Sequence, residues 1–121
     1  LRLLLLLVLV APCLAEGVPD ELQGVWRASG QLPAPAGQHS MSWMLEYTFG
    51  SDGSYKMTGY PPITESGRLD VEPGEAGHYL LKFSQRVFMN EKSVDVSYPA
   101  ELNSAQQSIQ FHNKTFFRAS P

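Results

Sequence analysis

From residue 24 onwards, apolar and polar side chains alternate along the chain. The clearest case is residues 42–49, in which every odd position is aromatic or aliphatic and most even positions are polar. A period of two predicts half-buried β-strands, and no segment of this region shows the period of an amphipathic helix. We expect eight strands, over residues 24–30, 41–50, 54–60, 66–72, 78–87, 93–98, 107–112 and 115–119.

Turn-forming residues separate these segments. Residues 51–54, Ser-Asp-Gly-Ser, indicate a hairpin because Asp-Gly suits the positive φ angles of a type I′ turn. Residues 73–77, 90–92 and 113–114 contain the Pro, Gly and Asn that mark further reversals. These short connections leave no room for crossover helices. The predicted fold class is therefore all-β, an eight-stranded antiparallel up-and-down meander that closes into a small barrel without an exposed edge.

The first 15 residues have a different pattern. They include 13 apolar residues, and Arg2 is followed by an unbroken apolar run over residues 3–11. Nine residues of helix rise only about 14 Å, roughly half of a bilayer core, so this run is too short to span a membrane. A basic residue, an apolar core and small residues at its end predict a secretory signal peptide, residues 1–15, that is cleaved after Ala15.

Cys13 lies close to the predicted cleavage site, where bacterial lipoproteins carry a lipidated cysteine. Pro12 stands where the lipoprotein motif requires a small residue, so we expect no lipid anchor. The sequence therefore predicts an exported protein, secreted or periplasmic, that does not span a membrane. Its mature part, residues 16–121, has the length of one domain.

Composition narrows the classes of function. The chain has 12 Asp plus Glu against 9 Lys plus Arg, and without Arg2 the mature part has 8 basic residues and a formal charge of −4. Such a balance argues against nucleic acid as a partner, since nucleic acid selects basic surfaces. The only Cys precedes the mature part, which excludes a disulfide scaffold, a thiol enzyme and a Cys-ligated zinc site there.

Three short motifs resemble those of a known family. Gly24-Val25-Trp26 is similar to the Gly-x-Trp signature of the first strand of lipocalins and their calycin relatives, and residues 49–55 resemble the Phe-x-x-Asp-Gly-x-Tyr hairpin of bacterial lipocalin-like domains. Arg118 occupies the place of the basic residue on the last strand. The resemblance implies a calycin barrel in which Arg118 stacks on Trp26. Such a cation–π contact contributes about 0.5–2 kcal/mol.

The resemblance also implies a ligand site at one end of the barrel. Strand alternation places four connections at this mouth, over residues 31–40, 60–64, 88–91 and 112–114. Apolar residues at hairpin tips are unusual and would line a mouth. The candidate ligand-binding residues at the mouth and in the interior are Leu32, Tyr47, Tyr55, Tyr60, Ile63, Phe88, Met89 and Tyr98.

The interior is expected to be rich in rings, and an eight-stranded barrel either fills itself or holds one small ligand. Tyr47, Tyr55 and Tyr98 carry hydroxyls that need partners. They bond to one another and to backbone, or they orient a ligand. The positions expected to face inward are Trp26, Ala28, Trp43, Leu45, Tyr47, Phe49, Tyr55, Met57, Leu69, Val71, Tyr79, Leu81, Phe83, Val94, Val96, Tyr98, Ile109, Phe111 and Phe116.

Residues that commonly support catalysis or bind metals are scattered. His39, His78 and His112 lack the spacing of a metal pair, and the meander places His78 and His112 at opposite ends. No nucleophile elbow, phosphate loop or dinucleotide fingerprint occurs. We therefore predict no enzyme activity, no cofactor and no metal.

Charged strand residues fall on outward positions, which predicts solvated cross-strand pairs. They are Glu46, Asp70, Glu72 and Asp95 beside Lys56, Lys82 and Arg86. Residues 113–115, Asn-Lys-Thr, match the glycosylation sequon at a predicted hairpin tip, and the sequence leaves its use open.

We predict that this monomeric barrel binds a small apolar or amphipathic molecule and catalyses no reaction. Two alternatives involve a protein partner. Residues 22–26 resemble the Leu-x-Gly-x-Trp start of small periplasmic metalloprotease inhibitors. In those inhibitors an N-terminal trunk enters the protease, and residues 16–20 would be the trunk here. Those inhibitors also carry a disulfide, which the mature part of this chain lacks. The other alternative is an accessory subunit of an envelope complex, with Phe88 and Met89 as contacts.

Overall fold

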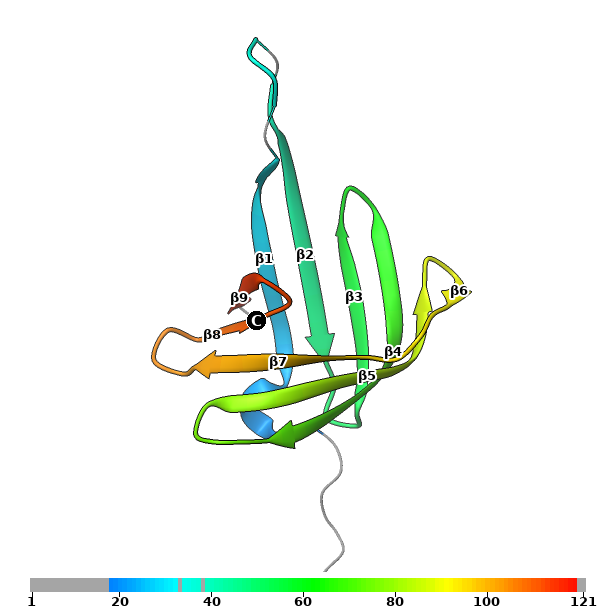
Figure 1. Cartoon of the computed structure of the whole chain (residues 1–121), viewed down its shortest axis with the longest axis vertical. Coiled ribbons are helices and arrows are strands. Elements are labelled where there is room, and N and C mark those ends of the chain that lie inside the picture. Colours follow the sequence, from blue (N-terminus) through cyan, green and yellow to red (C-terminus); the bar gives the residue numbers. More distant parts are fainter. Residues whose placement is uncertain (1–17, 33, 38, 120–121) are drawn as a thin grey trace, which may run out of the picture.

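The computed structural model describes residues 18–32, 34–37 and 39–119, so the predicted leader lies outside the described part. Within these residues, one 3₁₀-helix and nine strands form (Figure 1). They are η1 (Asp20–Leu22), β1 (Gly24–Leu32), β2 (Met41–Phe49), β3 (Ser54–Tyr60), β4 (Ile63–Pro73), β5 (His78–Phe88), β6 (Glu91–Lys92), β7 (Val96–Asn103), β8 (Ser108–Phe111) and β9 (Lys114–Arg118).

The strands form a closed antiparallel barrel. Within the described residues, eight strands pair in the order β1-β2-β3-β4-β5-β7-β8-β9, and β9 pairs back with β1. β6 has two residues and pairs only with the end of β5, beside the barrel wall. Each of these eight strands pairs with the one that follows it along the wall in chain order, as short connections require. The predicted eight-stranded up-and-down barrel is confirmed.

The seventh strand lies further along the chain than predicted. β7 begins at Val96 rather than at residue 93, and Val94, which we expected in the interior, is 74% exposed. β7 also continues past the predicted end at residue 98, through Pro99, although proline cannot donate in a ladder. The backbone nitrogen of Pro99 faces β8, but among the described residues β8 pairs with β7 only at residues 101–103. The missing N–H therefore costs no ladder bond.

The N-terminal segment closes one end of the barrel. Leu22 of η1 is fully buried, Val18 packs against the same core, and Trp26 Nε1 donates to the Leu22 carbonyl at 2.9 Å. Arg118 lies over Trp26, with its Cζ atom 4.2 Å from the ring centroid. Its guanidinium also donates to two carbonyl oxygens of residues 21–23, at 2.7 and 2.6 Å. The contact between Arg118 and Trp26 that the sequence indicated is present, and it ties the first strand, the last strand and η1 together.

Aromatic side chains fill the middle of the barrel. The ring of Tyr47 lies 5.3 Å from that of Phe111 and 5.4 Å from that of Phe116, centroid to centroid. Phe111 and Phe116 stack at 4.7 Å with 15° between their planes. The largest fully buried side chains are Trp26, Tyr55, Phe49, Phe83, Phe116, Leu22, Leu69, Leu81 and Ile109. A ligand deep in the barrel would have to displace these rings.

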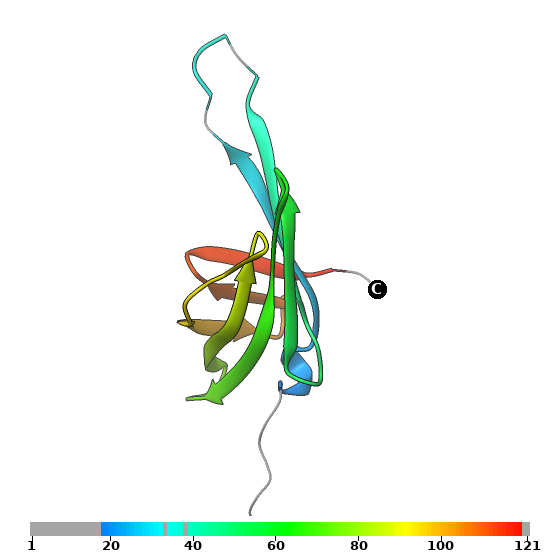
Figure 2. The same cartoon turned by 90° about the vertical axis from the view of Figure 1, so that its right-hand side faces the viewer.

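The wall is less complete at the opposite end, the mouth. Among the described residues, β9 pairs with β1 only at Trp26 and Arg27, and β8 reaches β7 only at residues 101–103. The β8–β9 hairpin is thus joined to both neighbours near the closed end, while the β1–β2 hairpin projects well beyond the other strands (Figures 1 and 2). A seam therefore separates β1 from β9 near the mouth.

Candidate functional site

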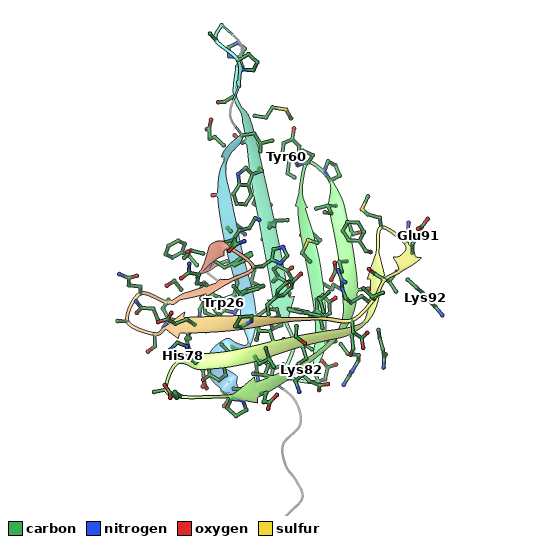
Figure 3. All side chains as sticks on the ribbon, in the orientation of Figure 1. Trp26, Tyr60, His78, Lys82, Glu91 and Lys92 are labelled. Atoms are coloured by element: carbon green, nitrogen blue, oxygen red, sulfur yellow. The ribbon has the colours of Figure 1, made fainter. Side chains whose placement is uncertain are left out.

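A pocket of about 400 Å³ lies at the mouth. Three of the candidate residues line it: Leu32 at the end of β1, Tyr60 at the end of β3 and Ile63 at the start of β4. Figure 3 shows Tyr60 at the mouth end, beside the projecting hairpin. The lining residues are Leu32, Trp43, Met44, Leu45, Tyr60, Pro61, Ile63 and Lys114.

Apolar and aromatic side chains from β1, β2, β3 and β4 make most of this pocket. Trp43 on β2 pairs with Gly30 on β1, and an added Cβ on Gly30 would lie 2.7 Å from Trp43 Nε1. Glycine therefore leaves the space that the indole occupies. Leu45 follows Trp43 on the same face of β2, and Ile63 on β4 completes the apolar lining. The exposed sides of Leu32 and Tyr60, 43% and 59%, remain available to a bound molecule.

Lys114 is the only charged residue among the described residues that line the pocket. It begins β9, and its Nζ atom lies 5.7 Å from the centroid of the Trp43 ring. None of the three ion pairs within the described part of the chain includes Lys114. The sequence places this lysine in a mouth loop but gives no signal of a role for it, because a single lysine in a turn is usually a solvated residue.

Phe88 and Met89 do not line the pocket. Phe88 is the last residue of β5 and Met89 follows it, and these two tip residues are 37% and 47% exposed. The tip is attached to the start of β4, because the Met89 amide donates to the Thr64 carbonyl at 2.9 Å and the Thr64 amide donates to Met89 Sδ at 3.3 Å. Of the five apolar residues predicted at the mouth, Leu32, Tyr60 and Ile63 line this pocket, and the Phe88–Met89 tip is joined to Thr64 beside Ile63.

A buried polar cluster lies inside the wall between β4 and β5. Arg86 donates to both carboxylate oxygens of Glu65, at 3.0 and 3.1 Å, and the Tyr55 hydroxyl donates to the same carboxylate at 2.5 Å. Arg86 also donates to the Val94 carbonyl at 2.6 Å. The side chains of Glu65 and Arg86 are only 6% and 14% exposed. Tyr55 therefore has a carboxylate partner, which neither of the expected arrangements included.

A β-bulge explains why the sequence analysis missed this cluster and wrongly placed Arg86 on the outer surface. β4 and β5 shift register between Ser66 and Arg68, so that one residue of β4 faces two of β5. Gln85 takes φ +50° there, and the extra residue reverses the inward and outward positions beyond it. An added Cβ on Gly67 would lie 2.6 Å from a carbonyl oxygen of β5, so glycine permits the bulge.

The interior tyrosines are neutral phenols. Burial raises the pKa of Tyr47 well above its usual range, and the Glu65 carboxylate raises it further. Burial and the hydrogen bond to Glu65 raise the pKa of Tyr55, and burial raises the pKa of Tyr98. Within the described part of the chain, the hydroxyls of Tyr47 and Tyr98 make no hydrogen bond to another residue. Both can still donate to or accept from water or a small polar molecule.

His78 and His112 border one depression, although the strand order places them at opposite ends of the barrel, as expected. A pocket of about 550 Å³ lies where β7 and β8 diverge, and both His78 and His112 line it. His112 packs edge-on against Tyr98, with centroids 4.3 Å apart. His39 is exposed in the β1–β2 loop. Over residues 18–32, 34–37 and 39–119, no group of three His, Cys, Asp or Glu could hold a metal ion.

Of the predicted surface pairs, Glu72 and Lys82 are in contact at 2.9 Å. Glu46 pairs instead with Arg27, which donates to it at 2.8 Å across β1 and β2. The remaining charged residues on the predicted list, Lys56, Asp70 and Asp95, are exposed.

The described N-terminal residues lie against the barrel. Val18 is buried, and its carbonyl accepts a hydrogen bond from Gln23 at 2.8 Å. Gly24 begins β1 beside the contact between Arg118 and Trp26. Asn113, the first residue of the glycosylation sequon, is exposed in the β8–β9 turn.

No helix in the described ranges is long and apolar enough to cross a membrane. Comparisons with models of protein families, with curated proteins and with solved structures find no match.

Proposed function

We propose that this protein is an exported lipocalin-like carrier or sensor that binds one small apolar or amphipathic molecule at its mouth and catalyses no reaction. The closed eight-stranded barrel and the contact of Arg118 with Trp26 are consistent with the lipocalin likeness. The signal-like residues 1–15 support export.

The mouth pocket is the observation that carries the proposal. Its volume of about 400 Å³ falls within the range of known small-molecule sites, and its lining is mostly apolar. The packed rings of Tyr47, Phe111 and Phe116 occupy the middle of the barrel, so the ligand belongs at the mouth rather than deep inside. The hydrophobic effect supplies the affinity, since a ligand here covers apolar surface that water now contacts.

Titration of the purified protein with N-phenyl-1-naphthylamine, a neutral apolar dye, tests the proposal. We expect one saturable site and dye emission typical of an apolar environment. Leu32→Ser should weaken binding about fivefold, because a bound molecule covers this half-exposed side chain. Phe117→Ser is the matched control, since Phe117 is 53% exposed and does not line the pocket. Absence of saturable binding, or equal losses in both variants, would refute the proposal.

A further inference from the structure

We infer that the ligand of the mouth pocket is an amphipathic anion, whose charged head group binds Lys114 and whose apolar chain lies on Trp43, Leu45 and Ile63. This inference rests on the proposed function and adds the chemical class of its ligand. The class comprises molecules with an apolar chain and a terminal carboxylate or similar anionic group.

The charge distribution of the pocket carries the first step. Lys114 supplies the only formal charge among the described lining residues, and no carboxylate lines the pocket with it. Within the same part of the chain, Lys114 has no carboxylate within ion-pair distance. A positive charge beside apolar surface favours an anionic partner, because an ionic hydrogen bond is stronger there than in bulk water. A cationic ligand would be repelled.

The position of Lys114 gives the second step. It lies in the β8–β9 hairpin, across the seam from β1, whereas the apolar lining comes from β1 to β4. The charged and apolar sides of the pocket are therefore on different elements. A ligand with its head group at Lys114 can direct its chain toward Leu45 and Ile63. An amphipathic molecule matches this separation better than a wholly apolar one.

Trp43 connects the two sides. Its ring lines the pocket, and the Lys114 ammonium lies 5.7 Å from its centroid. A cation at this distance from an indole face is held weakly. An anionic head group offers Lys114 a stronger partner, while the ring remains available to the chain. The other large depression, between β7 and β8, contains Glu101 and no lysine or arginine in its described lining, so it does not favour an anion.

Isothermal titration of the full protein with three ligands of equal chain length tests the inference. The ligands are dodecanoate, dodecanol and dodecyltrimethylammonium, each below its micelle concentration. We expect dodecanoate to bind about tenfold more tightly than dodecanol, as one charge-assisted hydrogen bond allows, and the cation to bind most weakly. Lys114→Gln should remove the preference for dodecanoate and leave the dodecanol affinity unchanged. Lys114→Arg should keep the preference.

Lys92→Gln is the matched control. It removes the same charge from the mouth end, but Lys92 is exposed on β6 and lies away from Tyr60 in Figure 3. We expect its dodecanoate affinity to match that of the unmodified protein. Equal binding of dodecanol and dodecanoate, or an equal loss of the preference in both glutamine variants, would overturn the inference and leave the proposed function standing. Failure of all three ligands to bind would overturn both.

Discussion

Arg86→Met should destabilise the barrel far more than loss of an ordinary surface arginine. In the folded chain, Arg86 donates to both oxygens of Glu65 and to the Val94 carbonyl. The variant leaves a carboxylate that is 6% exposed, with only the Tyr55 hydroxyl as donor. Removal of one partner from a buried ion pair costs about 3–5 kcal/mol. A domain of this size has a free energy of unfolding of about 5–15 kcal/mol, so the loss is a large fraction of the total.

Arg27→Met provides the matched comparison. Arg27 also donates two hydrogen bonds to a carboxylate, that of Glu46, but the two side chains are 51% and 26% exposed. Water and salt screen such a pair, so its loss should cost about 1 kcal/mol or less. Both variants remove the same guanidinium from a cross-strand pair, so the difference reports the burial of the pair together with the extra bond from Arg86 to the Val94 carbonyl.

Urea unfolding followed by circular dichroism measures both costs, provided that the slope with urea stays constant between variants. The double variant Glu65→Met with Arg86→Met should recover most of the loss, because it leaves no unpaired buried charge. The reasoning is refuted if Arg86→Met costs less than about 1 kcal/mol, or no more than Arg27→Met.

Two further predictions concern the bulge and the closed end. Gly67→Ala should lower the free energy of unfolding by about 1–3 kcal/mol, because the new Cβ would lie 2.6 Å from a carbonyl oxygen. Gly74→Ala is the control and should cost less, because the nearest atom to its new Cβ is 3.5 Å away. Equal urea midpoints for the two variants would contradict this account. The Tyr79 hydroxyl donates a hydrogen bond to the Glu21 carboxylate, which lowers the pKa of Glu21 and raises that of Tyr79 to about 12. Tyr79→Phe should remove the stability that this bond gives the folded protein while Glu21 is ionised. Because the pKa of Glu21 is lower in the folded state, this stability is present above about pH 4 and is lost as pH falls, so thermal midpoints of the two proteins should converge in acid; a difference that persists there would contradict the assignment.

The alternation of side chains was enough to predict most of the wall. Residues 42–49 alternate with a period of two, and the odd positions of β2, residues 43, 45, 47 and 49, pack in or against the core. Gly53, with φ +88°, turns the chain after this strand, but Asp52 has no positive φ, so the turn is not the predicted type I′. The alternating directions of the strands determine which loops share an end of the barrel. Three of the predicted mouth residues, Leu32, Tyr60 and Ile63, therefore line one pocket. Local pattern and connection length therefore specify the barrel and its mouth.

The chemistry of the interior depends on contacts between strands that the pattern does not contain. One bulged residue, Gln85, reverses the face of Arg86, and no local signal marks it except a glycine on the opposite strand. The polar cluster with Glu65 follows from that reversal. Lys114 reaches Trp43 only because the β8–β9 hairpin closes the barrel against β1. Periodicity describes which side of one strand is buried; register between strands, which the packed tertiary structure sets, decides which side chains meet.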